Sequence, residues 1–368
     1  MRGAGIILPV LATCSVASAS DLQDASPIFG DYVKKTGGTA EWMKKHPDST
    51  LLVHMNIPGA HDSASWNYTQ ANQDAFRPLT DRNGMKPAEP ESLRCQEQPF
   101  ITMLNAGIRA FDLRYASDPD NKHLFFYHTS ALLSDTATVD NVLQGFYQWL
   151  DDHPSETIFL SLLHESETAK NPVNDETSQR HLYNVLTSEQ ARRYFVQAKE
   201  LGTLGESRGK MTLLRRFSLD QLPASDVNTL PGLYFPLDRW PDNGAEFELT
   251  YNDTNKLTAY IGDYYHPETP AGSSVAENVK WKYDATTENL KRAVDEHPDS
   301  LFWTWASGVN GGNQPPIWPR TLALGDGDGG VNHQLVPFFE GQKGKRLGIV
   351  MFDYFDQPTD LLETFLGV

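Results

Sequence analysis

Cysteine is nearly absent from this sequence. The 368 residues include two, Cys14 and Cys95. Cys14 falls in an N-terminal segment that has the features of a cleaved leader, so Cys95 would remain without a partner for an intramolecular disulfide. This excludes the class of small secreted proteins that disulfides hold together. The chain must instead be stabilised by a hydrophobic core, and its length is sufficient to bury one.

Positive charge is also scarce. Lys and Arg number 31 against 48 Asp and Glu, which gives a formal net charge of −17 at pH 7. Binding of nucleic acid independent of base sequence needs a basic surface, so we expect no nucleic-acid partner. The same charge excludes a general attraction to anionic membranes. Any anionic ligand must therefore be bound by a local Arg or Lys.

Apolar runs long enough to span a membrane are absent beyond the N-terminus. Residues 1–20 contain one Arg, an apolar middle and an end of small residues, which predicts a secretory signal peptide cleaved after Ala19 or Ser20. A buried N-terminal strand is the alternative. We therefore expect a secreted protein whose single folded domain comprises residues 21–368. Sequons at Asn67 and Asn252 favour a glycoprotein.

Eight short apolar runs, rich in β-branched and aromatic residues, have the length of strands. They begin at Leu51, Gly107, Leu124, Thr157, Met211, Leu257, Leu301 and Arg346. Helical spacing of apolar residues lies between several of them, at 98–107, 138–154, 188–202 and 275–298.

Strands alternating with helices predict an α/β protein, a closed parallel β/α barrel of the TIM type. The gap between the second and third runs is too short for a helix, so we expect an irregular, distorted barrel. A doubly wound open sheet is the alternative fold. The first strand is not followed by a Gly-rich phosphate-binding fingerprint, which speaks against that alternative.

Ionisable side chains stand where nearly every predicted strand ends. The C-terminal ends of barrel strands meet at one rim, which is where barrel enzymes carry their chemistry. The residues are His61 and Asp62, Asp112 and Arg114, His128, His164 and Glu165, Arg215 and Arg216, Asp263 to Tyr265, and Asp353.

Each of these residues also has a structural interpretation. A single His near an apolar strand is more often a hydrogen-bonded structural group than a catalyst. Asp112 and Arg114 could form an ion pair at the rim, and Asp353 could cap a helix that begins near Pro358. Two His with acids beside them make a catalytic site more plausible than either would alone.

Signals for a metal site are weak. The sequence has no His-x-x-x-His pair. The stretch GDGDGG at 325–330 resembles the start of a calcium loop, but the twelfth position counted from Asp326 is Pro337 instead of Glu. We predict neither a metal nor another cofactor.

Two imidazoles, an Arg and acids suit the cleavage of a phosphodiester. One His takes a proton from a nucleophile and the other gives a proton to the leaving oxygen. An Arg offers a planar, permanently charged fork for the phosphate oxygens. A hydroxyl of the substrate can serve as the nucleophile, so this chemistry requires neither a metal nor a nucleophile from the enzyme.

Several motifs resemble those of bacterial-type phosphatidylinositol-specific phospholipase C, a family of X-domain phosphodiesterases. IPGAHDS resembles the family's first-strand motif, AGIRAFDLR its second, and LFFYHTS stands where the family carries its second His. Thr129 departs from the Gly that usually follows this His. DDHPSETIFLSL, LGESRGKMTLLRRFS, WPDN, YIGDYY and GIVMFDYF continue in the expected order, so the resemblance runs from about Leu51 to the C-terminus.

The resemblance implies roles for individual residues. His61 would be the general base on the inositol 2-hydroxyl, oriented by Asp353, and His128 the general acid toward the diacylglycerol oxygen, assisted by Asp62. Arg114 would bind the phosphate, with Asp112 organising it. Arg216 and Asp263 would hydrogen-bond inositol hydroxyls, and Tyr265 would stack on the ring. The products would be diacylglycerol and inositol 1,2-cyclic phosphate.

Two positions bear on metal and substrate. Calcium-dependent relatives carry Asn where this chain has Asp62, and an acidic pair where it has Asp112 and Arg114, so we predict metal independence. Bacterial relatives have a Lys at the end of the fourth strand, where this chain has Leu163. The exact head group, phosphatidylinositol or a glycosylated form, therefore stays open.

The membrane contact that this substrate requires would be apolar and transient. Trp318 lies in a Gly/Pro-rich loop and suits the edge of a bilayer, although it could equally pack beneath its loop. We expect a monomer. The alternatives to this function are a metal-dependent glycerophosphodiesterase, which would need clustered carboxylates, and a catalytically silent inositol-lipid-binding protein, which would usually lack one of the two His.

Overall fold

The computed structural model describes residues 19–83, 86–118, 120–165 and 174–367. Nine strands follow one another around a nearly closed barrel. In spatial order they are β7 (Leu233–Tyr234), β6 (Lys210–Arg216), β5 (Thr157–His164), β2 (Ala110–Ser117), β1 (Ile57–Ala60), β11 (Ile349–Phe352), β10 (Leu301–Trp305), β9 (Leu257–Gly262) and β8 (Phe247–Asn252).

All neighbouring strands from β7 to β9 are parallel, and β8 is antiparallel to β9. The prediction of an irregular barrel is confirmed. Part of the irregularity lies after β2, where the gap between the second and third predicted strands is too short for a helix. There β3 (Leu124–His128) runs antiparallel to β2, and β4 (Ala131–Leu132) runs antiparallel to β3.

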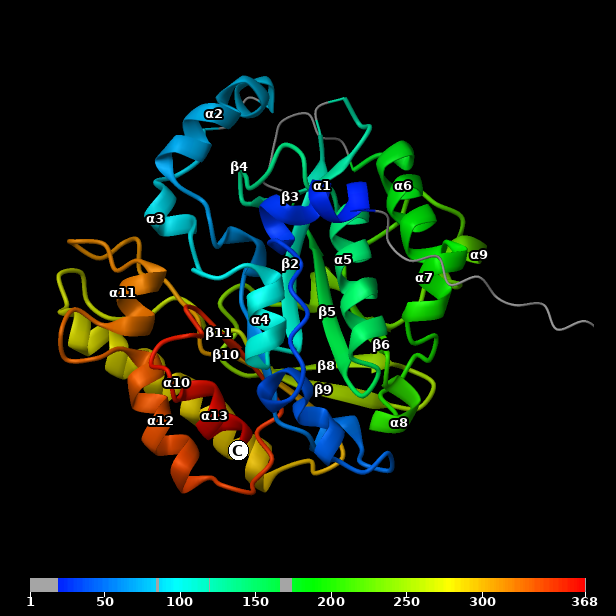
Figure 1. Cartoon of the computed structure of the whole chain (residues 1–368). Coiled ribbons are helices and arrows are strands. Elements are labelled where there is room, and N and C mark those ends of the chain that lie inside the picture. The colour runs from blue at the N-terminus through cyan, green and yellow to red at the C-terminus, as the bar shows by residue number, and fades with distance from the viewer. Residues whose placement is uncertain (1–18, 84–85, 119, 166–173, 368) are drawn as a thin grey trace, which may run out of the picture.

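Helices surround the strands (Figure 1). They are α1 (Ala19–Phe29), α2 (Gln70–Thr80), α3 (Pro90–Leu93), α4 (Phe100–Ala106), α5 (Val139–Asp152), α6 (Glu176–Thr187), α7 (Glu189–Tyr194), α8 (Leu204–Ser207), α9 (Ala224–Val227), α10 (Val275–Asp295), α11 (Pro319–Leu324), α12 (Val331–Gly341) and α13 (Leu361–Leu366). Short 3₁₀ turns occupy Gly38–Lys45, Leu52–His54, Ser63–Ser65, Asp81–Asn83 and Leu237–Arg239.

Residues along each strand alternate between two hydrophobic clusters, as the period of two requires. Ala110, Phe159 and Met351 belong to the inner cluster, together with Trp303 and Trp305. Their neighbours Phe111, Leu160 and Val350 belong to the outer cluster, which packs against the helices and includes Phe100, Phe146 and Trp149. The barrel therefore has a filled interior and a second apolar layer outside it.

The end of the barrel opposite the predicted rim is closed by a buried ion pair. Arg109 precedes β2 and Glu156 precedes β5, and both side chains are 0 % exposed. Arg109 Nη2 lies 2.7 Å from Glu156 Oε2. The remaining guanidinium N–H groups donate to backbone carbonyls, including those of Leu104 and Ala40 at 2.8 Å.

Some expectations about elements were wrong. The apolar run from Leu51 is a strand only from Ile57, because Leu52–His54 forms a 3₁₀ turn. A short apolar run has no periodicity that separates a buried turn from a buried strand. The helix expected over 188–202 ends at Tyr194, and Phe195 instead forms a bridge to Met211. The short strands β4, β7 and β8 were not predicted.

Candidate active site

The first catalytic candidate is assembled by two neighbouring strands from opposite ends of the chain. The register pairs Ala60 with Phe352, so the residues that follow, His61 and Asp353, lie side by side at the C-terminal rim. His61 Nδ1 is 2.8 Å from Asp353 Oδ1, and Gly308 N donates to the other carboxylate oxygen at 3.2 Å. Asp353 is thus a partner of His61. The interpretation as a helix cap is wrong, because α13 begins at Leu361 after the N-cap Asp360.

The tautomer of His61 follows from its two hydrogen-bond partners. Arg114 Nη2 lies 2.9 Å from His61 Nε2, and since Arg can only donate, Nε2 accepts. Nδ1 therefore carries the proton and donates to Asp353. Burial lowers the pKa of His61, but the carboxylate of Asp353 outweighs this effect and the pKa is raised above its usual value.

Arg114 is surrounded by three carboxylates. Its guanidinium nitrogens lie 3.8 Å from Asp62, 3.5 Å from Asp112 and 3.7 Å from Glu165. Burial opposes the charge of Arg114, but these acids hold its pKa above the usual range. The guanidinium therefore offsets part of the negative charge of these three acids.

A second His and acid pair lies beside the first. His128 ends β3, and its Nδ1 is 2.5 Å from Asp62 Oδ2 and 2.8 Å from the carbonyl oxygen of Leu93. Burial raises the pKa of Asp62, but His128 and then Arg114 outweigh it and lower that pKa to about 2. The site thus contains two imidazoles, each with Nδ1 held by a buried carboxylate.

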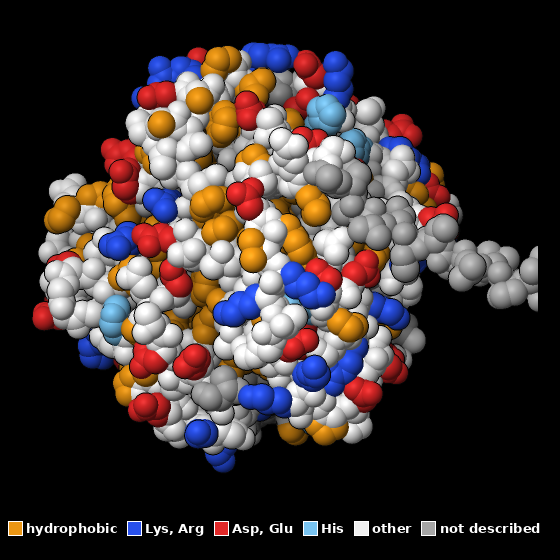
Figure 2. Space-filling view, viewed as in Figure 1, with side chains coloured by type: hydrophobic (Ala, Val, Ile, Leu, Met, Phe, Trp, Pro, Cys, Tyr) orange, Lys and Arg blue, Asp and Glu red, His pale blue; other side chains and the backbone are white. Residues whose placement is uncertain are grey.

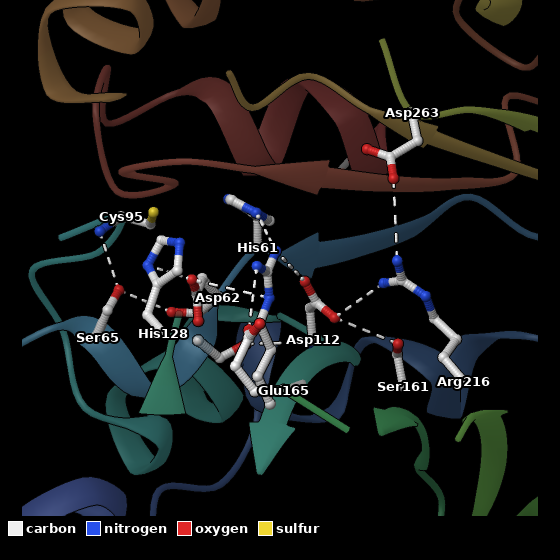
Figure 3. A network of polar contacts seen from close by, with 12 residues as sticks. His61, Asp62, Ser65, Cys95, Asp112, His128, Ser161, Glu165, Arg216 and Asp263 are labelled. Atoms are coloured by element: carbon white, nitrogen blue, oxygen red, sulfur yellow. Dashed lines mark hydrogen bonds and ion pairs between the residues drawn. The ribbon is translucent and has the colours of Figure 1, made fainter. Parts of the chain in front are cut away.

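Further polar contacts extend from Asp112 through Arg216 to Asp263 (Figure 3). Asp112 Oδ1 is 3.3 Å from Ser161 Oγ and 3.3 Å from Arg216 Nη1. Arg216 lies 3.9 Å from Asp263 and 4.0 Å above the ring of Trp240, whose Nε1 donates to Asp263 at 2.9 Å. Burial lowers the pKa of Arg216.

A cavity of about 510 Å³ joins these residues. Six of the predicted site residues line it directly: His61, Arg114, His128, Arg216, Asp263 and Tyr265. Asp62, Asp112 and Asp353 lie behind them and are 0 %, 0 % and 1 % exposed. Its volume falls in the range of small-molecule sites. Leu163 also lines the cavity, whereas His164 packs against Tyr115 and has a pKa lowered to about 4 by burial.

Sequence reasoning missed several residues of the cavity. Trp240 covers Arg216, and Asp242 accepts the hydroxyl of Tyr265 at 2.7 Å. Both come from the motif WPDN, which offered a signal through its resemblance alone. Glu165 was noted but not assigned to the site. Cys95 gave no signal, since a lone thiol is more often a small buried apolar group.

Cys95 lies between the two His and acid pairs. It is free and 0 % exposed, and burial raises the pKa of its thiol. Its sulfur forms a close group with His61 and Asp353, and another with Asp62 and His128, each with ligand atoms within 4.8 Å of one another. Among the described residues these two sets have the ligand types of a soft metal such as zinc.

The remaining expectations fall outside the cavity. Trp318 is half-buried at the N-terminus of α11, and its ring packs near Gly311. The Nδ2 groups of the two sequon residues donate to backbone carbonyls, Asn67 to Pro27 and Asn252 to Lys199. The predicted signal peptide lies outside the described residues up to position 18. Within the described parts of the chain, every helix is too short or too polar to cross a membrane.

The chain is similar to known proteins in sequence. Residues 91–217 match the family model "Phosphatidylinositol-specific phospholipase C, X domain". The 1-phosphatidylinositol phosphodiesterase of Staphylococcus aureus (strain Newman) is 23 % identical over 277 residues, 74 % of this chain and 76 % of that protein. The enzyme of that name from Listeria monocytogenes is 31 % identical over 191 residues, 50 % of each chain.

Human PI-PLC X domain-containing protein 3 is 35 % identical over 139 residues, which cover 34 % of this chain and 42 % of that protein. The fold is shared with solved structures of phosphatidylinositol-specific phospholipase C. The S. aureus structure matches with a TM-score of 0.65 and 20 % identity over 89 % of this chain and 97 % of that one. The L. monocytogenes structure matches with a TM-score of 0.61 and 23 % identity, and the match covers 90 % of this chain and 98 % of that one.

Proposed function

We propose that this chain, whose residues 91–217 belong to the phosphatidylinositol-specific phospholipase C X-domain family, cleaves phosphatidylinositol to diacylglycerol and inositol 1,2-cyclic phosphate. One observation carries the proposal. Two imidazoles, each with Nδ1 within 2.8 Å of a buried carboxylate oxygen, face one cavity that is also lined by a buried Arg. The relatives named as 1-phosphatidylinositol phosphodiesterases support the choice of substrate.

His61 acts as the general base. Its Nε2 has the lone pair, because Nδ1–H is bonded to Asp353. Nε2 takes the proton of the inositol 2-hydroxyl while that oxygen attacks phosphorus. Asp353 fixes the tautomer and stabilises the imidazolium that forms, as the acid of a His–Asp pair does in other hydrolases.

His128 acts as the general acid. Its Nδ1 is held by Asp62, so its other nitrogen, when protonated, is the one that gives a proton to the leaving diacylglycerol oxygen. The low pKa of Asp62 keeps that carboxylate ionised beside the imidazolium. The bond from phosphorus to the glycerol oxygen breaks as the bond to the 2-oxygen forms, and the two imidazoles exchange protonation states.

Arg114 binds the phosphate and stabilises the charge that develops on it. Its guanidinium contacts His61 Nε2, and the substrate hydroxyl and phosphate replace this contact. Asp112 holds Arg114 and Arg216 together. On the far wall, Arg216 and Asp263 hydrogen-bond inositol hydroxyls and Tyr265 stacks on the ring.

The reaction proceeds without a metal ion. Arg114, held among Asp62, Asp112 and Glu165, supplies the positive charge that a cation would bring. The prediction is that release of diacylglycerol from labelled phosphatidylinositol in detergent micelles is the same in 5 mM EDTA as in calcium. Loss of activity in EDTA that calcium restores would instead identify a metal-dependent phosphodiesterase.

The same assay tests the catalytic pair. His61→Ala and His128→Ala should each lower kcat by at least about 10²–10⁴-fold, the usual contribution of general acid–base catalysis. His54→Ala is the matched control, because the His54 side chain pairs with Asp299 at the surface, and this variant should retain full activity. A wild-type protein that binds inositol lipid vesicles but releases no diacylglycerol would be a silent lipid-binding protein.

The enzyme would work as a secreted monomer that touches membranes transiently. Solved structures of the S. aureus phospholipase C concern the modulation of its membrane binding. On this chain Trp318 beside the cavity residues Gly311 and Pro319 is the candidate for such a contact.

A further inference from the structure

A second cavity lies on the outside of the barrel, around Arg215. The two adjacent Arg at the end of β6 point to opposite faces, as neighbours in a strand must. Arg216 lines the catalytic cavity, whereas Arg215 lines a separate cavity of about 320 Å³. The crossover from β6 to β7, which includes α9, forms the wall of this second cavity.

The cationic group in this cavity is almost fully buried. Arg215 is 8 % exposed, and its Nε has no hydrogen-bond partner. Among the described residues no carboxylate forms an ion pair with it; its guanidinium lies 5.3 Å above the ring of Tyr234. A buried charge is ordinarily paired with an opposite charge, and a cation–π contact recovers only part of the cost of removing it from water.

A second cation lies near the same wall. Lys199 donates to the carbonyl oxygen of Leu230, a residue that lines the cavity. Burial, and then the charge of Arg215, lowers the pKa of Lys199 to about 8, and burial lowers that of Arg215 to about 10. The acid that lines the cavity, Asp220, accepts from Gln179 at 2.8 Å. Among the described residues neither Arg215 nor Lys199 forms an ion pair, although the protein as a whole carries a net charge of −17.

Most of the other lining residues are apolar; the polar ones are Ser218, Asp220, Asn228 and Tyr234. Phe217, Leu219, Leu222 and Leu230 are at most 7 % exposed and belong to the outer hydrophobic cluster, and Val227 packs against it. The cavity thus combines one fixed cationic fork with an apolar wall. Its volume is at the lower end of the range for small-molecule sites.

We propose that this cavity binds an anionic amphiphile, a single acyl chain with a carboxylate or phosphate head group, outside the catalytic site. The head group pairs with the planar guanidinium of Arg215, which matches the geometry of both oxyanions, and Lys199 adds a second positive charge. The acyl chain lies against the leucines of the wall. The inference rests on the unpaired Arg215 and is independent of the catalytic activity.

Isothermal titration of the full protein below the micellar concentration tests the proposal. Dodecanoate and dodecyl phosphate should both bind at one saturable site. The ratio of their two dissociation constants identifies the preferred head group. Inorganic phosphate should not bind, which separates an amphiphile site from a simple anion site. Dodecyltrimethylammonium should bind at least tenfold more weakly than dodecanoate.

Variants locate the site. Arg215→Met should weaken dodecanoate binding at least tenfold and, since it removes an unpaired buried charge, should leave the protein folded. Val227→Trp fills the cavity and keeps the charge, so it should have the same effect. Arg77→Met, a surface residue paired with Asp74, is the matched control and should bind as the wild type does.

Arg114→Met distinguishes the two cavities. It should retain dodecanoate binding if the ligand occupies the site at Arg215. The proposal is overturned if neither amphiphile binds, if Arg215→Met binds as tightly as the wild type, or if Arg114→Met and not Arg215→Met loses the ligand.

Discussion

At the scale of single residues, the backbone is unusual directly after three of the proposed catalytic side chains. Asp62, Thr129 and Tyr354 follow His61, His128 and Asp353, and they adopt φ values of 41°, 48° and 46°. Side chains other than Gly are uncommon there, and a β-branched residue such as Thr129 least of all. Since strained backbone clusters at functional sites, these turns support the assignment of the three reactive residues.

The pKa of His61 gives a prediction about pH. The base must be neutral, so activity rises as pH increases through this pKa, which Asp353 holds above the usual value despite burial. Asp353→Asn removes that effect, so the acidic limb of the profile of kcat/KM against pH should move to lower pH. The plateau value of kcat/KM should fall by about 10²–10⁴-fold, because Asn no longer holds His61 in the tautomer with the proton on Nδ1. An unchanged limb would mean that His61 is not the base.

Glu165 predicts a change in substrate affinity. It lies 3.7 Å from Arg114, near the proposed position of the phosphate, and burial raises its pKa. Glu165→Gln removes a negative charge, so KM should fall by about threefold to tenfold, which corresponds to about 1 kcal/mol. The difference in KM between Glu165→Gln and the wild type should be present above the pKa of Glu165. It should vanish below this pKa, where the wild-type carboxyl is already neutral.

Glu248→Gln, on the exposed face of β8, is the control for this comparison and should leave KM unchanged. If Glu165→Gln raises KM at every pH, Glu165 instead positions Arg114 for the phosphate.

At the scale of elements, the motif that contains Arg114 also carries a structural Arg. Arg109 and Glu156 are buried at the closed end of the barrel, and the guanidinium satisfies carbonyls from several segments. The two Arg of this motif therefore have different tasks, one directly before β2 and one within it.

Removing one charge of the pair should destabilise the fold. Glu156→Gln leaves the Arg109 cation buried without its counter-charge, so the free energy of unfolding in urea should fall by about 3–5 kcal/mol. The double variant Arg109→Met with Glu156→Leu should lose less than Glu156→Gln alone. Specific activity of the folded protein should be unchanged, and a loss of activity without loss of stability would contradict this role.

Long periodic elements were predictable and short ones were not. α5 and α10 show apolar residues at helical spacing over several turns, and β5 and β6 are buried apolar runs. β7 has two residues, and β8 is half-exposed at the barrel edge, so neither has a strong pattern. β1 was placed too early because its apolar run continues into a buried turn.

The candidate site was predictable where residues end or directly follow strands. Asp112 and Arg114 were expected at the end of the second strand, but they lie within β2, which continues to Ser117. His61, Arg114, His128 and Asp353 converge because the sheet register brings strand ends together. Trp240 and Asp242 come from a connection between β7 and β8, whose path no periodicity specifies. Cys95 reaches the site from the segment after α3 for the same reason.

At the scale of the whole molecule, negative charge predominates without forming a single-sign surface on the face seen in Figure 2. Lys and Arg side chains are interspersed there among Asp and Glu. A net charge of −17 nevertheless repels anionic bilayers at long range. The approach to a membrane must therefore rely on apolar groups near the cavity. Leu237, which is 40 % exposed, lines the cavity mouth and is such a group.

Vesicle composition and salt test this account of membrane contact. Hydrolysis of phosphatidylinositol should be slower in vesicles diluted with phosphatidylglycerol than in those diluted with phosphatidylcholine. Raising the ionic strength from about 0.01 M to 0.15 M shortens the Debye length from about 30 Å to 8 Å, so it should raise the rate on phosphatidylglycerol vesicles. Leu237→Ala should lower the ratio of the rate on vesicles to that on a monomeric short-chain substrate, and Val33→Ala, an exposed residue lying outside the cavity lining, should not. A faster rate on anionic vesicles at low salt would show that a local basic surface, instead of apolar contact, governs binding.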